Sequence, residues 1–212
     1  MPIIEEARQW YPTADPVHGF DHVLRVYHLA ERLARTEGAD LEIVLAAVLL
    51  HDAQGNSSHQ AVARQDHQRA SAEFAGQILQ AEGWPEPRVA AVQHCIRAHR
   101  FRDEREQPTT LEAQVLFDAD KLDAIGAIGV ARAVAFAALA GQPAYATPSP
   151  RFLESGQLAP GEPHSAYHEF LFKLRKLKDR LYTPAARAIA VERHTAMAEF
   201  FERLGEEVQG QL

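Results

Sequence analysis

The chain of 212 residues has a single cysteine, Cys95, so it can form no internal disulfide. This cysteine usage is typical of a reducing compartment, and we expect a cytoplasmic protein. Positive charge is also scarce, because 22 Lys and Arg stand against 29 Asp and Glu, a formal net charge of −7. A protein that coats duplex DNA or RNA needs the opposite sign, so nucleic acid is not an expected partner.

Long hydrophobic runs are absent as well. The two most apolar stretches, 41–50 and 125–140, cover ten and sixteen residues, and they contain Glu42 and Arg132. A membrane-spanning helix requires about 18–20 apolar residues, so both stretches are interpreted as buried helices. The N-terminal sequence MPIIEEARQW also lacks the basic start and apolar centre of a secretory signal. We therefore expect a soluble protein with no membrane partner.

Period-two alternation of apolar residues is nearly absent, whereas steps of three and four dominate, which favours an all-α fold. The predicted helices cover about 21–36, 40–51, 66–82, 87–99, 110–120, 126–133, 164–182 and 184–204. Between them, 141–163 is predicted to be a loop with five of the twelve prolines, and loops this long are typical of functional lids. The segment 55–65 is a second candidate lid. No composition shift divides the chain, so one domain over 1–212 is expected.

Polar residues interrupt two of the apolar helices. His51 and Asp52 close the run LEIVLAAVLL, and imidazole with carboxylate suits Zn, Mn, Fe, Co or Ni. Further along, Asp118, Asp120 and Asp123 lie within six residues of an otherwise apolar helix. Burying such carboxylates is costly unless they bind a cation. The alternative interpretations are a polar helix end at 51–52 and a solvated helix start at 118–123.

Five stretches in order resemble the HD-domain metal-dependent phosphohydrolase superfamily, in particular the small bacterial HD hydrolases that include nucleotide pyrophosphohydrolases. They are HGFDHVLRV, LLHDAQG, the AHR around His99, FDADKLDAIGAIGVAR and HEFLFKLRKLKDRLYTPAAR. The resemblance covers nearly the whole chain. It implies a helical bundle with a metal site in a central crevice, core motifs over about 18–132, and C-terminal helices 164–205 packed on the core.

The resemblance also implies one divalent ion, which could be Mn, Mg, Co, Ni, Fe or Zn. Its ligands would be His22 of the H-x-x-R-V pattern, His51, Asp52, and Asp120 of the A-D-[KR]-L pattern. Asp118 remains an alternative as last ligand, or as a group that orients a ligand.

Such an ion lowers the pKa of a water molecule and neutralises phosphate charge, while nearby cations stabilise the developing negative charge. The expected catalytic residues are Asp52, Lys121, which follows a ligand directly, and His99, as a phosphate contact or proton donor. The expected substrate contacts are Arg25, His18 and Lys173.

One departure concerns the turn after Asp52. Many HD phosphohydrolases have a glutamate there, whereas this chain reads Ala-Gln-Gly-Asn and has no carboxylate before Asp66. We expect a phosphohydrolase of nucleotides that splits a nucleoside triphosphate into monophosphate and pyrophosphate, or that cleaves a phosphomonoester. One alternative is a non-catalytic nucleotide- or metal-binding regulatory domain.

A second alternative is a phosphodiesterase of cyclic or linear dinucleotides. It would need histidines for a second ion, and the i,i+5 spacing of His94 and His99 does not place them on one helix face. Four further histidines in polar or amphipathic surroundings are interpreted as surface or edge residues: His28, His59, His67 and His194.

Overall fold

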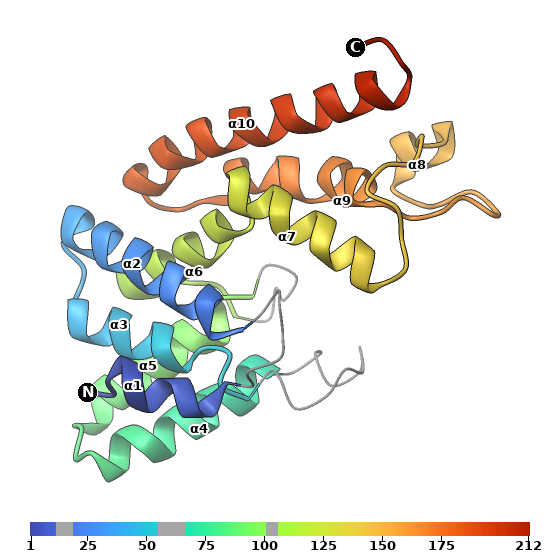
Figure 1. The fold of residues 1–212 in the computed structure, drawn as a ribbon. Helices are drawn as coiled ribbons and strands as arrows, with labels where there is room; N and C mark the ends of the chain where they lie inside the picture. The colour runs from blue at the N-terminus through green and yellow to red at the C-terminus, as the bar shows by residue number, and fades with distance from the viewer. Residues whose placement is uncertain (12–18, 55–66, 101–105) are drawn as a thin grey trace. The chain divides into compact units, whose positions relative to one another are not determined.

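The computed structural model describes residues 1–11, 19–54, 67–100 and 106–212, and in these residues the regular structure is helical, with no strand (Figure 1). This confirms the all-α prediction. The elements in chain order are α1 (Ile4–Ala7), η1 (Arg8–Trp10), α2 (Phe20–Glu37), α3 (Leu41–Leu50), α4 (His67–Ala81), α5 (Glu86–Ala98), α6 (Leu111–Asp123), α7 (Gly126–Leu139), α8 (Pro150–Ser155), α9 (Ala166–Phe172), η2 (Leu174–Arg180) and α10 (Pro184–Val208).

The connection between α2 and α3 shows how the sequence sets the helix limits. Helix α2 ends at Gly38, whose φ of 80° lies in the left-handed region that glycine adopts without strain. Two residues later, the Asp40 side chain accepts hydrogen bonds from the backbone N–H groups of Glu42 and Ile43. This N-cap satisfies two of the donors that a helix start leaves open.

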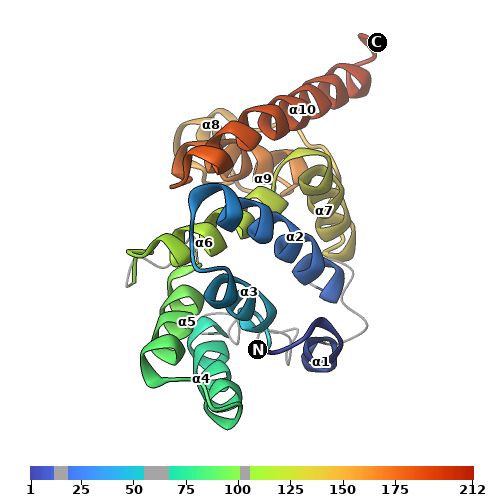
Figure 2. The ribbon, with the colours of Figure 1, turned by 90° about the vertical axis from the view of Figure 1, so that its left-hand side faces the viewer.

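The chain forms two compact units. The first consists of residues 1–120 and 181–186, and the second of 121–180 and 187–212. In the first unit, α3 packs against both α2 and α5, and α4 lies beside α5 (Figures 1 and 2). Every residue of α3 from Ile43 onward is buried, so the helix that carries His51 at its end is the centre of this unit.

In the second unit, α7 and α9 pack together, and aromatic rings join α9 to α10. The rings of Phe170 and Phe201 are stacked with centroids 4.7 Å apart, and the Tyr167 ring contacts both, at 6.1 Å and 6.0 Å. Stacked pairs of this kind add roughly 0.5–1.5 kcal/mol to the stabilisation from buried area. The prediction of one domain with helices 164–205 on the core is not tested by these two units.

Three local predictions need correction. The N-terminal α1 and η1 were not expected. The predicted loop 141–163 contains α8, which starts where the Ser149 side chain accepts the N–H of Phe152 and Pro150 occupies the first helical position. The predicted helix 164–182 breaks at Lys173 and continues as the 3-10 helix η2. A 3-10 turn repeats every three residues, which aligns the buried Leu174 and Leu177.

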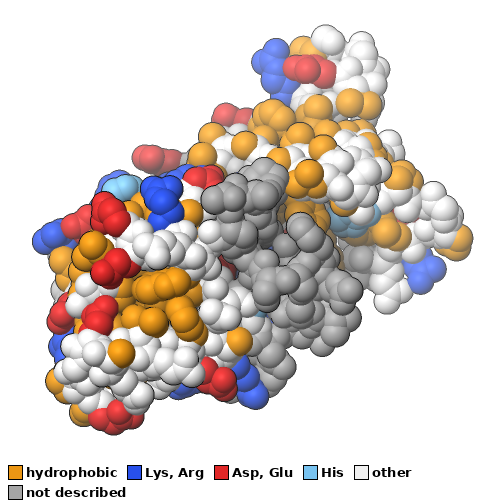
Figure 3. Space-filling model, turned by 60° about the horizontal axis from the view of Figure 1, so that its bottom comes forward, with side chains coloured by type: hydrophobic (Ala, Val, Ile, Leu, Met, Phe, Trp, Pro, Cys, Tyr) orange, Lys and Arg blue, Asp and Glu red, His pale blue; other side chains and the backbone are white. Residues whose placement is uncertain are grey.

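In the described part of the chain, no single helix is long and apolar enough to cross a membrane. Helices α6 and α7 together meet the length and composition criteria, but they are bent by 64° at their junction. On the face shown in Figure 3, the Lys and Arg side chains of described residues are scattered among Asp and Glu.

Candidate metal centre

The end of α3 fixes the orientation of His51. Its ring Nδ1 lies 2.7 Å from the carbonyl oxygen of Val48, one turn earlier in the helix. A carbonyl only accepts hydrogen bonds, so Nδ1 must carry the proton and Nε2 of the neutral ring keeps its lone pair. His51 is completely buried, and its Nε2 is therefore presented to the interior as a ligand atom.

The end of α5 repeats this arrangement. His99 follows the last residue of α5, and its Nδ1 lies 2.6 Å from the carbonyl oxygen of Ile96. The same argument leaves the lone pair on Nε2. The two rings meet edge to face with centroids 5.2 Å apart. Two helix ends thus bring two histidines together, each with its tautomer set by a carbonyl of its own helix.

Asp52 lies between these histidines and a third. Its Oδ2 is 3.6 Å from Nε2 of His51, and its Oδ1 is 3.6 Å from Nε2 of His99. His67, the first residue of α4, places its Nε2 3.2 Å from the same Oδ1. Burial alone would raise the pKa of the Asp52 carboxyl, but the surrounding histidines hold that pKa well below its ordinary value. Asp52 is therefore ionised at neutral pH, as a metal ligand must be.

His22 joins the group from the first turns of α2. Its ring is buried, and its centroid lies 5.6 Å from that of His51. The Nε2 of His22 is 3.4 Å from Oδ1 of Asp120 on α6. Helix α2 begins after Gly19, so His22 is in its first turn, where the side chain faces the end of α3. The structure thus brings all four predicted ligands into one neighbourhood.

Two overlapping groups in the described residues have the spacing of metal ligands. In each group the three ligand atoms lie within 4.8 Å of one another. One group is His22, His51 and Asp52, and the other is Asp52, His67 and His99. Asp52 belongs to both groups. Its Oδ2 faces His51, and its Oδ1 faces His67 and His99. Two imidazoles and one carboxylate suit a divalent transition metal in either case.

Unsatisfied atoms at this place support a cation. The Nε2 of His51 is buried and has no hydrogen-bond partner in the described part of the chain, and the buried Oδ1 of Asp52 has no partner there beyond the His67 and His99 rings. A buried polar atom without a partner costs about 1–3 kcal/mol, and more when it is charged. A bound divalent ion would satisfy both atoms at once. The residues present therefore fit the metal that the sequence implies.

The other predicted site residues lie as follows. The carboxylate of Asp118 is engaged by the backbone of residues 182 and 183. Arg25 donates to Asp21, one turn earlier, at 2.6 Å. Lys121 is buried and is the first residue of the second unit. His18 and the candidate lid 55–65 lie outside the described residues.

Sequence reasoning missed His67, which was interpreted as a surface residue. Its contact with Asp52 depends on how α4 packs in the first unit, and periodicity within α4 carries no such information. His94, considered beside His99 for a second ion, instead places Nδ1 2.7 Å from Oε1 of Glu106. His67, and not His94, is therefore the second histidine that lies beside His99 at the Asp52 carboxylate.

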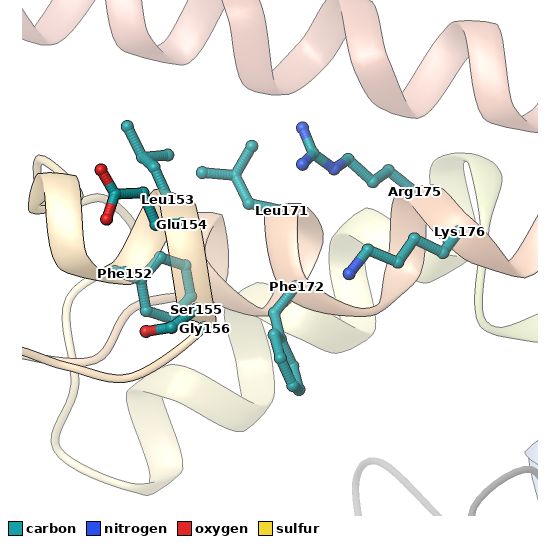
Figure 4. A pocket seen from close by; sticks show the side chains of 9 residues that line it. All are labelled: Phe152, Leu153, Glu154, Ser155, Gly156, Leu171, Phe172, Arg175 and Lys176. Atoms are coloured by element: carbon teal, nitrogen blue, oxygen red, sulfur yellow. The ribbon is translucent and has the colours of Figure 1, made fainter.

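The second unit contains a hollow of about 140 Å³ beside α8 (Figure 4). Phe152 of α8 lines one side, and Arg175 and Lys176 of η2 stand on the other. Of the predicted site residues that the structure describes, none lines this hollow. Lys173, the predicted substrate contact in the same stretch, forms an ion pair with Glu169 at 3.0 Å.

Comparisons with known proteins agree with this arrangement. The model of the HD domain family matches residues 19–125, which contain all four predicted ligands. The uncharacterized protein YpgQ of Bacillus subtilis is 35% identical over 213 residues, which cover 97% of this chain and 94% of that protein.

Solved structures are similar over almost the whole chain. YpgQ of Bacillus subtilis in complex with ADP has a TM-score of 0.72 at 30% identity, covering 98% of this chain and 99% of that one. A Lactobacillus plantarum protein has a TM-score of 0.74 at 33% identity, covering 98% and 95%. An HD-superfamily hydrolase from Bacillus thuringiensis has a TM-score of 0.69 at 28% identity, covering 97% and 96%.

Proposed function

This chain belongs to the HD domain family, and we propose that it is a divalent-metal-dependent phosphohydrolase that acts on nucleotides. The observation that carries the proposal is the group of His22, His51 and Asp52, whose ligand atoms lie within 4.8 Å of one another. One of these atoms, His51 Nε2, is buried without a hydrogen-bond partner among the described residues. A purely structural helix end would leave this cost uncompensated.

His22, His51, Asp52 and Asp120 would hold the ion. When bound, it would supply a water of lowered pKa and would neutralise charge on the phosphate. The chain's own groups have separate tasks. The Val48 carbonyl keeps the His51 proton on Nδ1 and so preserves a ligand atom at Nε2. The Asp52 carboxylate provides the fixed negative charge at the centre.

His99 is proposed to act at the substrate side of Asp52. Because its Nδ1 proton is committed to the Ile96 carbonyl, the neutral ring can only accept at Nε2. His99 can therefore donate a proton to a leaving oxygen only as an imidazolium, and its Nε2 lies 3.6 Å from the Asp52 carboxylate. Lys121 is proposed to stabilise phosphate charge, and His18, Arg25 and Lys173 are proposed to contact the substrate.

A nucleotide substrate is supported by one relative. YpgQ of Bacillus subtilis has been solved in complex with ADP, and this chain matches it over nearly its full length. The proposed reaction is hydrolysis of a nucleoside triphosphate to monophosphate and pyrophosphate. A phosphomonoester is the alternative substrate.

The test is phosphate and pyrophosphate release from a panel of nucleoside mono-, di- and triphosphates with Mn, Mg, Co or Ni added. We expect pyrophosphate from triphosphates, lost in Asp52→Ala together with metal retention. The matched control is Glu31→Gln, which changes a carboxylate of α2 whose ion-pair partner is Arg35. Activity that survives in Asp52→Ala contradicts the site. Metal binding without release from any substrate favours a regulatory nucleotide- or metal-binding domain.

A second candidate function has its own observation. Asp52, His67 and His99 form another group with ligand spacing, and two ions are a common arrangement for cleaving phosphodiesters. This favours hydrolysis of cyclic or linear dinucleotides as the alternative. Metal analysis of purified protein distinguishes the two. A two-ion enzyme retains two ions per chain, and His67→Ala reduces this to one, whereas a one-ion enzyme retains one ion in both proteins.

A further inference from the structure

A buried tyrosine lies behind the candidate metal centre. Tyr11 directly follows η1, and only 4% of its surface is exposed. Its hydroxyl donates a hydrogen bond of 3.0 Å to the carbonyl oxygen of Leu49 in the last turn of α3. The carbonyls of a last helical turn have no partner within the helix, so this contact satisfies one that would otherwise be buried and open.

The Tyr11 side chain also lies within electrostatic range of the Asp52 carboxylate. Tyr11 therefore anchors the last turn of α3, from which His51 and Asp52 follow directly. His51 has a separate anchor in the Val48 carbonyl.

The ring of Tyr11 reaches the second ligand-bearing helix. It packs against Phe20, the first residue of α2, with centroids 5.5 Å apart and planes tilted by 53°. Phe20 lies two residues before His22. The guanidinium of Arg8 covers the Phe20 ring at 4.6 Å, which holds that ring from the side of η1.

We propose that Tyr11 is a positioning residue that holds the end of α3, and with it His51 and Asp52, in place relative to His22. The proposal rests on the metal centre proposed above. Groups that orient metal ligands typically change metal affinity 10–100-fold when they are removed. The hydroxyl of Tyr11 holds the Leu49 carbonyl at the end of α3, and its ring packs on the start of α2, so one side chain links the two helices that carry His22, His51 and Asp52.

Loss of the hydroxyl has a specific consequence. The Leu49 carbonyl loses its partner, while the Val48 anchor of His51 and the ring contact with Phe20 remain. The end of α3 then samples more conformations, and the carboxylate of Asp52, three residues after Leu49, is less often in the position that a bound ion needs. A defect in ion affinity follows even though the fold is kept.

The test is Tyr11→Phe, which removes only the oxygen. The matched control is Tyr182→Phe in the same unit, because the Tyr182 hydroxyl donates to Gln107 and its ring lies against Phe117. Calorimetric titration of metal-free protein with Mn²⁺ is expected to show binding about 10–100-fold weaker in Tyr11→Phe and unchanged in Tyr182→Phe. Far-UV circular dichroism and thermal unfolding establish that each variant is folded at the titration temperature.

A second measurement, of hydrogen exchange, does not depend on the affinity for Mn²⁺. In metal-free wild-type protein the backbone amides of the last turn of α3 are expected to exchange their hydrogens at least about tenfold more slowly than in Tyr11→Phe. Unchanged Mn²⁺ affinity in Tyr11→Phe, or equal weakening in both phenylalanine variants, overturns the role of Tyr11. Wild-type protein that binds no Mn²⁺, Co²⁺ or Ni²⁺ overturns the proposed metal centre itself, and the role of Tyr11 with it.

Discussion

The carboxylate of Asp118 accepts two hydrogen bonds from Thr183, one from its backbone N–H and one from its hydroxyl, both at 2.7 Å. The backbone N–H of Tyr182 donates to the other carboxylate oxygen at 2.9 Å. Asp118 is completely buried, and Thr183 directly precedes Pro184, the first residue of α10. Asp118 thus holds the two residues that lead into a helix whose start is 66 positions away in the sequence, while the Thr183 hydroxyl oxygen accepts from the N–H of Ala186 in that helix.

This contact predicts a stability role for Asp118. In Asp118→Ala, two buried backbone N–H groups and one hydroxyl lose their acceptor. We expect the free energy of unfolding to fall by about 3 kcal/mol, with a smaller loss in Asp118→Asn, which keeps one acceptor oxygen. Urea denaturation of the metal-free protein measures this, and metal affinity at a temperature where the variant is folded should stay close to that of wild type.

Asp120, two residues later, is expected to affect metal binding rather than stability. Its Oδ1 lies 3.4 Å from Nε2 of His22, so it is the proposed last ligand. In Asp120→Ala we expect Mn²⁺ affinity to fall at least about tenfold, with a small change in the stability of the metal-free protein. Calorimetric titration beside Asp118→Ala decides between the two aspartates. If Asp118→Ala loses the metal and keeps its stability, then the ligand assignment is reversed.

The helices of the first unit were predictable because each has its own local signals. The apolar positions of α2 recur at steps of three and four, and Gly38 and Asp40 mark an end and a start. Their predicted limits agree with the structure to within one residue at each end. The signals of α8 are present in Ser149 and Pro150, but only Phe152 of this six-residue helix is buried, so no periodic stripe reveals it.

The candidate site was predictable only in part. The pattern of His22, His51, Asp52 and Asp120 is carried by sequence motifs, and the structure brings these residues together. The contribution of His67 depends on a contact between the start of α4 and the end of α3, which no spacing within either helix encodes. The hydroxyl of Tyr11 is a similar case, since its partner Leu49 lies 38 positions away.

Glu162 predicts an acid-sensitive second unit. Its carboxylate accepts hydrogen bonds from the hydroxyl of Ser149 at 2.7 Å and from the backbone N–H groups of Ser149 and Ala159, both at 2.6 Å. The Ser149 side chain is the main cause that lowers the pKa of Glu162 from 4.5 to about 2. A carboxyl with a lowered pKa stabilises the fold above its ordinary pKa and loses this contribution as the pH falls from 4.5 toward 2.

In Glu162→Gln the amide nitrogen replaces one acceptor oxygen and faces donors. We therefore expect the variant to be less stable than wild type at pH 6, and the difference in urea midpoint to shrink as the pH falls from 4.5 toward 2. The control is Glu154→Gln on the exposed face of α8, which should not change the pH dependence. A constant gap between Glu162→Gln and wild type over this range would contradict the assignment.

Two helical glycines in the second unit predict opposite effects of the same substitution. A Cβ at Gly129 of α7 would lie 2.3 Å from the carbonyl oxygen of Ala124 and 2.6 Å from Cε of Met197. The carbonyl belongs to the backbone and cannot move aside as a flexible side chain can. We expect Gly129→Ala to lower the free energy of unfolding by about 1–3 kcal/mol because of this overpacking.

At Gly205 of α10 the nearest atom to a new Cβ is Cε2 of Tyr145 at 3.4 Å, which is ordinary van der Waals contact. Alanine is favoured over glycine inside a helix by about 1 kcal/mol, so Gly205→Ala should raise the free energy of unfolding by up to this amount. Urea denaturation of both variants beside wild type compares the signs directly. A Gly129→Ala variant as stable as wild type would show that helix packing at Gly129 is looser than the close approach to Ala124 indicates.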